Sequence, residues 1–322
     1  MTVTGVVAGV VDSVLDRAIA PGYSVLGFTA RKHFWPADPP AGALRGRVAV
    51  VTGANSGLGK AAATGLAELG AIVRLVVRDT AKGEKARAEI LARVPGAEVR
   101  VDRCDVSDLA DVRKFAEGLT GPVDVLVHNA GVLPPSRTET ADGHEVALAT
   151  AVLGPFLLTD LLAPALRASA DGRVLFVSSG GMYSQPLRMD DPEYREGEFA
   201  GAKAYSRVKR MQVVLAELWA EELRTDAVVV HSMHPGWADT PGVSTSLPRF
   251  HQLAKPFLRT PEQGADTVVW LAASAEAGRE TGRFWHDRRV RPTHYLPWGK
   301  ESEVDRQALW AYCRSATAAC RR

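Results

Sequence analysis

Short valine-rich runs alternate with helix-length segments from residue 47 onward, and this alternation restricts the fold more than any other feature of the chain. Strands that are buried on both faces read as continuous apolar runs, and helical crossovers between them place successive strands parallel in one sheet. The runs are VAVVTG, IVRLVV, VRVDRCD, VDVLVHNAG, RVLFVSSG and AVVVHSMHPG. The sequence therefore predicts a doubly wound α/β fold with a parallel sheet, as a single domain over residues 47–300.

The chain ahead of this domain predicts a helical extension. Residues 2–20 carry apolar side chains at helical spacing, with Asp12, Asp16 and Arg17 on the other side. A loop rich in proline and aromatic residues, 21–40, is expected to follow, so that residues 1–46 form an amphipathic helix and a linker. We expect the helix to dock on the protein body or on a subunit partner. Contact with a membrane surface stays open, although the polar face lacks the lysines and arginines typical of that role.

The C-terminal part adds a few elements to the same domain. Residues 260–275 predict a helix, GRFWHD predicts a further strand, and residues 301–322 predict a last helix. No second domain is expected.

Composition excludes several kinds of partner. The 322 residues carry a net charge of +2 without long blocks of like charge, so no nucleic-acid partner is expected. Three cysteines without C-x-x-C or Cys/His clusters suit a reducing cytoplasm and predict no metal site. The N-terminus has neither a cleavable signal pattern nor an apolar run of the ~20 residues that span a bilayer. We expect a soluble cytoplasmic protein, with a homo-oligomer left open.

A glycine-rich turn, GANSGLG, follows the first predicted strand. Glycines at such a turn let backbone N–H groups and a helix N-terminus approach a pyrophosphate closely. A plain structural turn would show the same glycines, but their place between strand and helix at the start of a βαβ unit favours a dinucleotide site. The residues expected to bind the cofactor here are Gly53, Asn55, Ser56, Gly57, Leu58 and Gly59.

The end of the second predicted strand bears on the choice of cofactor. An NAD site usually has a carboxylate there, about 20 residues past the glycines, that holds the ribose 2′-hydroxyl. This chain has Val77 and then Arg78, with Asp79 next. An arginine can bind the additional 2′-phosphate through planar, charge-assisted contacts. The sequence therefore predicts NADP(H) rather than NAD(H), with Arg78 as a cofactor contact.

Tyr205 and Lys209 stand four positions apart in a segment that predicts a helix, so both lie on one helix face. A phenol has a reference pKa near ~10, and each unit of lowering requires about 1.4 kcal/mol of preferential stabilisation of the phenolate. A neighbouring ammonium group can supply much of that. Spacing alone would equally fit a surface pair.

In this order along residues 47 to about 290, the motifs TGxxxGxG, HNAG, VSS, Tyr-x-x-x-Lys and HPGWADT resemble the short-chain dehydrogenase/reductase superfamily. The resemblance implies a Rossmann fold and a hydride transfer between NADP(H) and a carbonyl or alcohol. It assigns the acid/base role to Tyr205, its support to Lys209, and a hydrogen bond to the substrate oxygen to Ser179 rather than Ser178. The cofactor contacts that it implies are Asp105, Val106, Asn129, Ala130, Gly131, Tyr205, Lys209, Pro235, Gly236 and Thr240.

Further stretches resemble one branch of this superfamily, called dehydrogenase/reductase SDR family member 12. They are SSGGM, MHPGWADTPGV, QGADTVVWLA and GRFWHDR. The wider neighbourhood includes retinol dehydrogenases, which implies a hydrophobic aldehyde or ketone as substrate, by analogy of fold and family. His234 and Trp237 are interpreted as parts of a turn at a strand end rather than as site residues.

Two departures from the superfamily pattern keep other interpretations open. Ala151 stands where the superfamily usually has an asparagine that helps a proton relay on the lysine. Its loss could slow the relay, or could mark a cofactor-binding regulatory or scaffold protein with weak or no turnover. Residues 182–199 form an insertion between Ser179 and Tyr205, which is expected to shape the substrate pocket, with a purely structural loop as the alternative.

Overall fold

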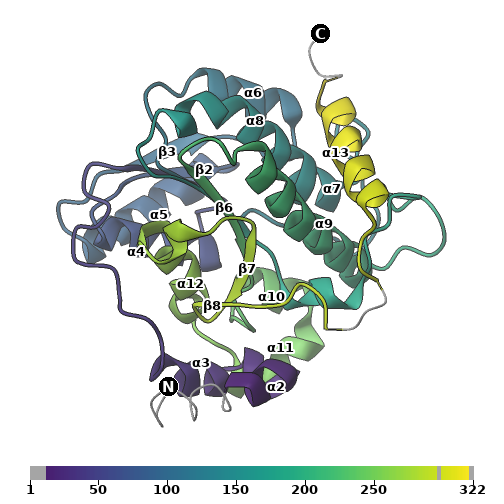
Figure 1. The fold of residues 1–322 in the computed structure, drawn as a ribbon, viewed down its shortest axis with the longest axis horizontal. Coiled ribbons are helices and arrows are strands. Elements are labelled where there is room, and N and C mark those ends of the chain that lie inside the picture. Colours follow the sequence, from purple (N-terminus) through teal and green to yellow (C-terminus); the bar gives the residue numbers. More distant parts are fainter. Residues whose placement is uncertain (1–11, 296–298, 319–322) are drawn as a thin grey trace.

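The computed structural model describes residues 12–295 and 299–318, and in these residues eight strands form one sheet (Figure 1). The strand order is β3-β2-β1-β4-β5-β6-β7-β8, parallel throughout except for the antiparallel pair β7–β8. The strands are β1 (Val48–Thr52), β2 (Ile72–Val77), β3 (Val99–Arg103), β4 (Val125–His128), β5 (Gly172–Val177), β6 (Val228–Met233), β7 (Arg283–His286) and β8 (Arg289–Val290). The predicted doubly wound α/β fold is confirmed.

Helices cover both faces of this sheet (Figure 1). One face carries α4 (Gly57–Glu68), α5 (Thr80–Arg93) and α12 (Pro261–Ala273). The other carries α6 (Leu109–Glu117), α8 (Gly154–Arg167), α9 (Gly201–Glu222) and α13 (Glu303–Ala318). The remaining helices are α2 (Ile19–Tyr23), α3 (Val25–Lys32), α7 (Val146–Leu148), α10 (Pro241–Ser246) and α11 (Pro248–Ala254).

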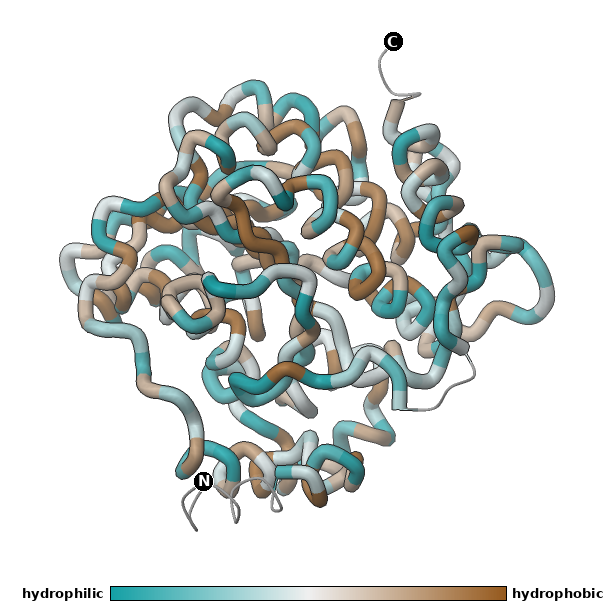
Figure 2. The backbone as a smooth tube through the Cα atoms, in the orientation of Figure 1, coloured by the Kyte–Doolittle hydropathy of each residue, from teal (hydrophilic) through white to brown (hydrophobic). Residues whose placement is uncertain are grey.

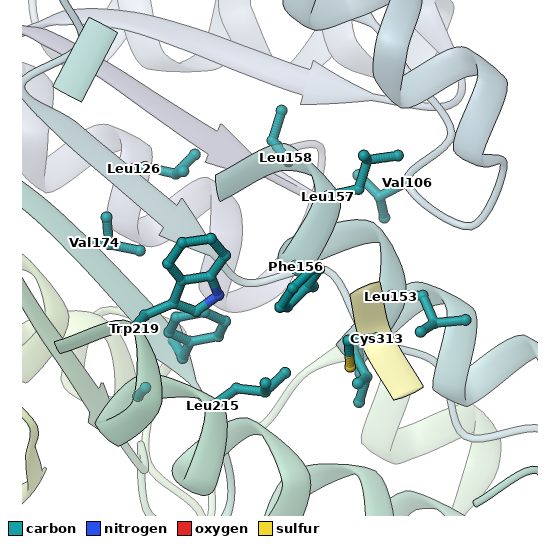
Figure 3. Packing of buried hydrophobic residues seen from close by; sticks show 14 of the residues in the cluster. Val106, Leu126, Leu153, Phe156, Leu157, Leu158, Val174, Leu215, Trp219 and Cys313 are labelled. Carbon is teal, nitrogen blue, oxygen red and sulfur yellow. The ribbon is translucent and has the colours of Figure 1, made fainter. Parts of the chain in front are cut away.

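Alternating strand residues divide the core into two clusters, because successive side chains of a strand point to opposite faces of the sheet. In β1, Val50 packs with α6, α8 and α9, whereas Ala49 and Val51 pack with α4, α5 and α12. Figure 2 shows the strands as a hydrophobic strip inside more mixed helices. On the α8–α9 face, Phe156 and Trp219 pack with ring centroids 5.2 Å apart (Figure 3). Burial on both faces explains why the strands read as unbroken apolar runs.

The helical run Val146–Arg167 is long and apolar enough to span a membrane by length and composition alone. It contains α7, a π-helical turn over Ala149–Leu153 and α8. In the fold, 83% of its most apolar window is buried. It is a core helix of the α/β domain.

The helix predicted at residues 260–275 is confirmed as α12, which begins with a capping box. Thr260 Oγ1 accepts a hydrogen bond from the Gln263 backbone N–H, while Gln263 Oε1 accepts from the Thr260 N–H. Such reciprocal bonds satisfy two N–H groups that have no partner inside the helix. The strand predicted at GRFWHD is confirmed as β7.

The N-terminal extension differs from its prediction in two ways. Residues 2–11 of the predicted helix lie outside the described residues, while 12–17 are helical and the helix breaks at Ala18, which has extended backbone angles. The loop predicted over 21–40 is wrong for its first part, because residues 19–32 form α2 and α3. The Ser24 side chain accepts a hydrogen bond from the Leu26 N–H and so begins α3 locally.

The extension docks through its acidic side. Asp12 is buried and forms ion pairs with Arg31 and Arg291, at 2.9 and 2.7 Å. Val14 and Ile19, which belong to the predicted apolar stripe, are instead 63% and 60% exposed. Helical periodicity identified the two sides of this segment but not which one faces the protein, since the buried Arg31 of α3 and Arg291, which follows β8, attract the carboxylates.

Candidate active site

The site lies where the strand order changes direction. β1 has β2 on one side and β4 on the other, so the chain leaves these neighbouring strands toward opposite edges of the sheet. Thr52 ends β1 and its Oγ1 accepts hydrogen bonds from the backbone N–H groups of Asn129 (3.0 Å) and Ala130 (3.1 Å), which follow β4. Open α/β sheets bind ligands in the crevice at such a position.

The glycine-rich turn after β1 has the geometry that its sequence predicts. Gly53 and Gly57 adopt positive φ angles of 65° and 52°, which side chains disfavour. A Cβ at Gly59 would lie 2.3 Å from the Gly53 carbonyl oxygen, so only glycine lets α4 pack this closely on the turn. Ser56 precedes α4, and its side chain accepts no hydrogen bond from the first helical turn. The N–H groups of that turn can therefore meet an anion.

A cavity of about 840 Å³ opens at this end of the sheet. All the residues predicted from the sequence to bind cofactor or substrate line it, although they come from seven separate segments. They are Gly53, Asn55, Ser56, Gly57, Leu58, Gly59, Arg78, Asp105, Val106, Asn129, Ala130, Gly131, Ser179, Tyr205, Lys209, Pro235, Gly236 and Thr240. The size of the cavity and the exposed helix N-terminus fit a dinucleotide; the individual contacts stay predictions.

One end of the cavity is lined by charged side chains that follow β2. Arg78 is 72% exposed, with its guanidinium 3.7 Å from the Asp105 carboxylate. The Asp79 carboxylate caps α5 by accepting from the Lys82 N–H at 3.1 Å, and this bond lowers its pKa. Lys82 also lines the cavity. Asp79 borders the same space, but its carboxylate is engaged by its own helix and lies 3.5 Å from Lys82 Nζ.

Ser179 and Tyr205 face the cavity from the ends of β5 and α9. Ser179 begins a 3₁₀ turn, where its Oγ accepts from the Gly181 N–H at 3.1 Å. Tyr205 is half-buried in the first turns of α9. Burial raises the pKa of the Tyr205 phenol, and its hydrogen bond with Ser179 opposes that shift. The phenol is therefore protonated at neutral pH and able to act as a proton donor.

Lys209 lies one helical turn beyond Tyr205, with its ammonium 5.3 Å from the centre of the phenol ring. The Nζ atom donates to the Val177 carbonyl at 2.8 Å and to Gln212 Oε1 at 2.9 Å. Burial lowers the pKa of Lys209 to about 7. Gln212 is fully buried and was not identified from the sequence; its only signal is its position three residues after the lysine on the same helix face.

Ala151 does not line the cavity. It is buried in the π-helical turn between α7 and α8 and packs in the core. Its neighbour Thr150 lines the cavity instead, and its Oγ1 donates to the Val146 carbonyl. π-Helical turns often occur next to functional sites. In this chain the fixed side-chain acceptor for Lys209 is Gln212, from α9.

Two histidines in the motifs serve the scaffold. His128 ends β4, bonds Thr159 Oγ1 through Nε2 at 2.8 Å, and burial lowers its pKa to about 3. His234 stacks on His286 with ring centroids 3.7 Å apart, and its Nδ1 accepts from the Gly236 N–H. Burial lowers the pKa of His234 well below its usual value. Both imidazoles are therefore neutral near pH 7, and both belong to the structure of the strand ends rather than to the cavity lining.

Several apolar residues that were not identified from the sequence also form the wall. Leu133, Trp237, Leu247 and Phe250 line the cavity, and the Trp237 and Phe250 rings meet edge to face at 5.3 Å. The sequence feature that could have identified them is their position after β4 and β6, because loops at the carboxyl ends of parallel strands surround the ligand site in such folds. Trp237, interpreted as a turn residue, therefore also faces the site.

The insertion has the structural role that was its alternative interpretation. None of residues 182–199 lines the cavity; only the flanking Gly181 and Ala202 do. Glu193 accepts from the Glu145 N–H at 2.8 Å and pairs with His144 at 2.7 Å and with Tyr312 of α13. These contacts raise the pKa of His144. The expectation that the insertion shapes the substrate pocket is thus wrong, because none of its residues lines the cavity. Through Glu193 the insertion instead links α13 to the start of α7.

Comparisons with known proteins give a consistent picture. The family model described as short chain dehydrogenase matches residues 47–249. Dehydrogenase/reductase SDR family member 12 of Bos taurus is 42% identical, covering 87% of this chain and 88% of that protein. Retinol dehydrogenase 12 of Homo sapiens is 35% identical, covering 76% and 78%. A solved structure from Beutenbergia cavernae with NADP bound at low occupancy is 26% identical, with a TM-score of 0.62, covering 77% and 97%.

Proposed function

Because the chain belongs to the short-chain dehydrogenase family, an oxidoreductase family, we propose that it transfers a hydride between NADP(H) and the carbonyl or alcohol carbon of a hydrophobic substrate. The observation that carries this proposal is the meeting of Ser179, Tyr205 and Lys209 on one cavity wall. The glycine-rich turn borders the same cavity. A protonated phenol beside a space large enough for both cofactor and substrate is the arrangement that carbonyl reduction requires.

In reduction, a bound nicotinamide supplies the hydride, which forms the new C–H bond as the carbonyl π electrons move to oxygen. Ser179 Oγ donates a hydrogen bond to that oxygen. Tyr205 transfers its phenolic proton there, giving the alcohol and a phenolate. The Lys209 ammonium stabilises the phenolate, and Gln212 holds the ammonium in place. Alcohol oxidation uses the same groups in reverse.

The preference for NADP(H) rests on the charges next to β2. Arg78, Asp79 and Lys82 all border the cavity, but the Asp79 carboxylate is engaged as the cap of α5 and lies 3.5 Å from Lys82 Nζ. Two cations favour a 2′-phosphate over a 2′-hydroxyl. In Arg78→Glu, the affinity for NADPH should fall about 10- to 100-fold, with NADH affected far less. Fluorescence titration with both cofactors measures this; equal NADH and NADPH affinities in the unmodified protein would refute the preference.

The hydrophobic substrate is inferred from apolar side chains in part of the cavity wall. Leu133, Leu247 and Phe250 line that part of the cavity, and apolar walls with few polar groups suit apolar ligands. The similarity to retinol dehydrogenase 12 supports the same class of substrate.

A second candidate is a cofactor-binding regulatory or scaffold protein with little turnover, motivated by Ala151. The experiment that separates the two uses NADPH deuterated at the transferable position, with a panel of apolar aldehydes and ketones. Deuterium in one stereochemical position of the alcohol supports the enzyme, and NADPH binding without product supports the scaffold. Tyr205→Phe should lower kcat about 10³-fold with NADPH affinity retained; undiminished turnover would contradict the mechanism.

A further inference from the structure

The N-terminal extension reaches the active site from behind through Tyr23, the last residue of α2. Tyr23 is only 5% exposed. Its ring lies edge to face with His234 at 4.3 Å, with His286 at 5.3 Å and with Trp237 at 6.2 Å between centroids. His234 and Trp237 flank the two cavity-lining residues Pro235 and Gly236. Tyr23 belongs to none of the motifs that carry the family resemblance, yet it packs directly against the loop that contains the predicted cofactor contacts Pro235 and Gly236.

The ring also backs the turn that carries Ser179. A Cβ placed on Gly180 would lie 2.5 Å from Tyr23 Cε2, with further ring atoms at 3.2 Å. Atoms that close cannot coexist without a shift. Tyr23 therefore occupies the space that a side chain at position 180 would need, and it limits where the Ser179 hydroxyl can lie.

The backbone of Tyr23 holds the loop after β6. The Tyr23 carbonyl accepts a hydrogen bond from the Trp237 N–H at 2.8 Å. A Cβ at Gly236, whose φ is 75°, would lie 2.7 Å from the same carbonyl oxygen. The loop at Pro235 and Gly236 is thus pressed against the extension on the side away from the cavity.

Two buried guanidinium groups fix the chain on both sides of Tyr23. Arg259 donates to the Gly22 carbonyl at 3.1 Å and to the Ser24 carbonyl at 3.2 Å, and Arg31 donates to the Gly22 carbonyl at 2.8 Å. Both arginines pair with Asp287, at 2.6 and 2.8 Å. The position of Tyr23 is therefore set by a charge-assisted network and not by helix α2 alone.

We propose that Tyr23 is a positioning residue of the active site, whose ring sets the Ser179 turn and whose carbonyl sets the cofactor loop at Pro235 and Gly236. The first half rests on the proposed function, because Ser179 matters only if a carbonyl is reduced. The second half concerns cofactor binding and does not need turnover. Tyr23 itself does not line the cavity, so its phenol would act on a bound ligand only through the residues that it supports.

The test is a double-mutant cycle between Tyr23 and Gly180 in the full chain. Gly180→Ala should lower kcat at least about tenfold, because its methyl group displaces the Ser179 turn from the Tyr23 ring. Tyr23→Ala should also lower kcat, since the turn loses its support. In the double variant the methyl group enters the space left by the ring, so kcat should exceed that of Gly180→Ala severalfold. Independent effects would instead multiply, and that result overturns the proposal for Ser179.

Cofactor affinity tests the second half by titration with NADPH. Tyr23→Ala should weaken NADPH binding about fivefold through the loosened loop, whereas Tyr23→Phe, which keeps the ring, should stay within about twofold. Ile19→Ser, on the exposed side of the same helix, is the matched control. If Tyr23→Ala binds NADPH as the unmodified protein does, the loop half is wrong. Tyr23→Leu replaces Tyr23→Ala in both arms if thermal melting shows that the alanine variant is unfolded.

The two failures are distinguishable. An unmodified protein that binds NADPH but reduces no carbonyl in the panel removes the proposed function and the Ser179 half with it, and the NADPH titration still decides the loop half. Turnover in the unmodified protein together with multiplying kcat effects in the cycle removes only the positioning role.

Discussion

The glycine-rich turn lines the candidate cavity and the N-terminal extension packs behind its wall, and the two regions are built by opposite means. The turn shapes its wall with backbone alone: Gly53 and Gly57 have positive φ, and Gly59 leaves no room for a Cβ. The extension uses large side chains, Tyr23 and Arg31, held by ion pairs that join residues more than 250 positions apart in the chain, as between Arg31 and Asp287. Local backbone geometry can be inferred from a short motif, but a distributed network of buried charges cannot.

This difference also concerns stability. The three glycines of the turn have no side chain to remove, so damage at these positions comes from adding atoms. Damage to the extension comes from removing them, because a buried charge that loses its partner remains desolvated. Mutations in the turn should therefore change mainly the NADPH affinity, and mutations in the extension should change mainly the free energy of unfolding.

The largest effect is expected from Asp287→Asn. This change removes the carboxylate that Arg31 and Arg259 share, so that Arg31 keeps only Asp12 and the buried Arg259 loses its carboxylate, while asparagine still tolerates the φ of 51° at this position. The free energy of unfolding should fall by about 3–5 kcal/mol, measured by urea denaturation. Arg188→Ala, which breaks an exposed pair with Asp190, is the control and should cost less than about 1 kcal/mol. Equal losses in both variants would show that the network does not hold the extension.

Gly59→Ala tests the opposite region. The new Cβ would meet the Gly53 carbonyl oxygen at 2.3 Å and Asn129 Nδ2 at 2.4 Å, so α4 must move away from the turn. NADPH affinity should fall about 100-fold, or ~2.7 kcal/mol, with a smaller change in stability. Gly118→Ala is the control, because a Cβ at this position makes only ordinary contacts beyond 3.4 Å and the φ of Gly118 is not positive. Unchanged NADPH affinity in Gly59→Ala would contradict the assignment of this turn to the cofactor.

A smaller effect is expected from Gln212→Met, which keeps the volume of the side chain but removes the Oε1 acceptor of Lys209. The ammonium should be less well fixed below the Tyr205 ring, and kcat should fall about tenfold with little change in the KM for NADPH. Steady-state kinetics at saturating NADPH measures this. An unchanged kcat would mean that the Val177 carbonyl alone positions the lysine.

A further expected effect is a change in acid sensitivity. Burial lowers the pKa of His128 to about 3, so the folded protein binds its proton less readily than the unfolded chain does. The contribution of His128 to stability is present above pH ~6.5 and is lost as the pH falls toward 3, by about 1.4 kcal/mol per unit. Urea denaturation between pH 7 and 5 should show a shallower loss in His128→Gln than in the unmodified protein. If the free energy of unfolding falls equally with pH in both proteins, His128 does not contribute to the pH dependence of stability.

The sequence predicted the fold and the place of the candidate site because both depend on local patterns. Continuous apolar runs identified the strands, the turn at Gly53 identified the cavity, and the spacing of Tyr205 and Lys209 placed both side chains on one wall. Gln212 was missed because a buried glutamine in a helix has no local signature that distinguishes it from a surface one.

The extension was only partly predictable, for a physical reason. Helical periodicity separates Val14 and Ile19 from Asp12 and Asp16, and burial of the apolar side is the ordinary outcome. Here ion pairs with arginines of distant segments bury the acidic side instead, and no sequence feature near residue 12 indicates that Asp12 will contact Arg291. The cavity walls at Leu247 and Phe250 were missed for the same reason, since contacts between distant segments decide which side chains meet.

The two edges of the sheet restrict how copies of this chain could assemble. Exposed edge strands are templates for strand addition and aggregation, which charged or very short strands prevent. At one edge, β3 carries Arg100 and Arg103, with side chains 64% and 57% exposed. At the other, the two residues of β8 end the sheet after an antiparallel turn. Neither edge offers a long apolar strand, so fibrillar growth by sheet extension is disfavoured at both ends.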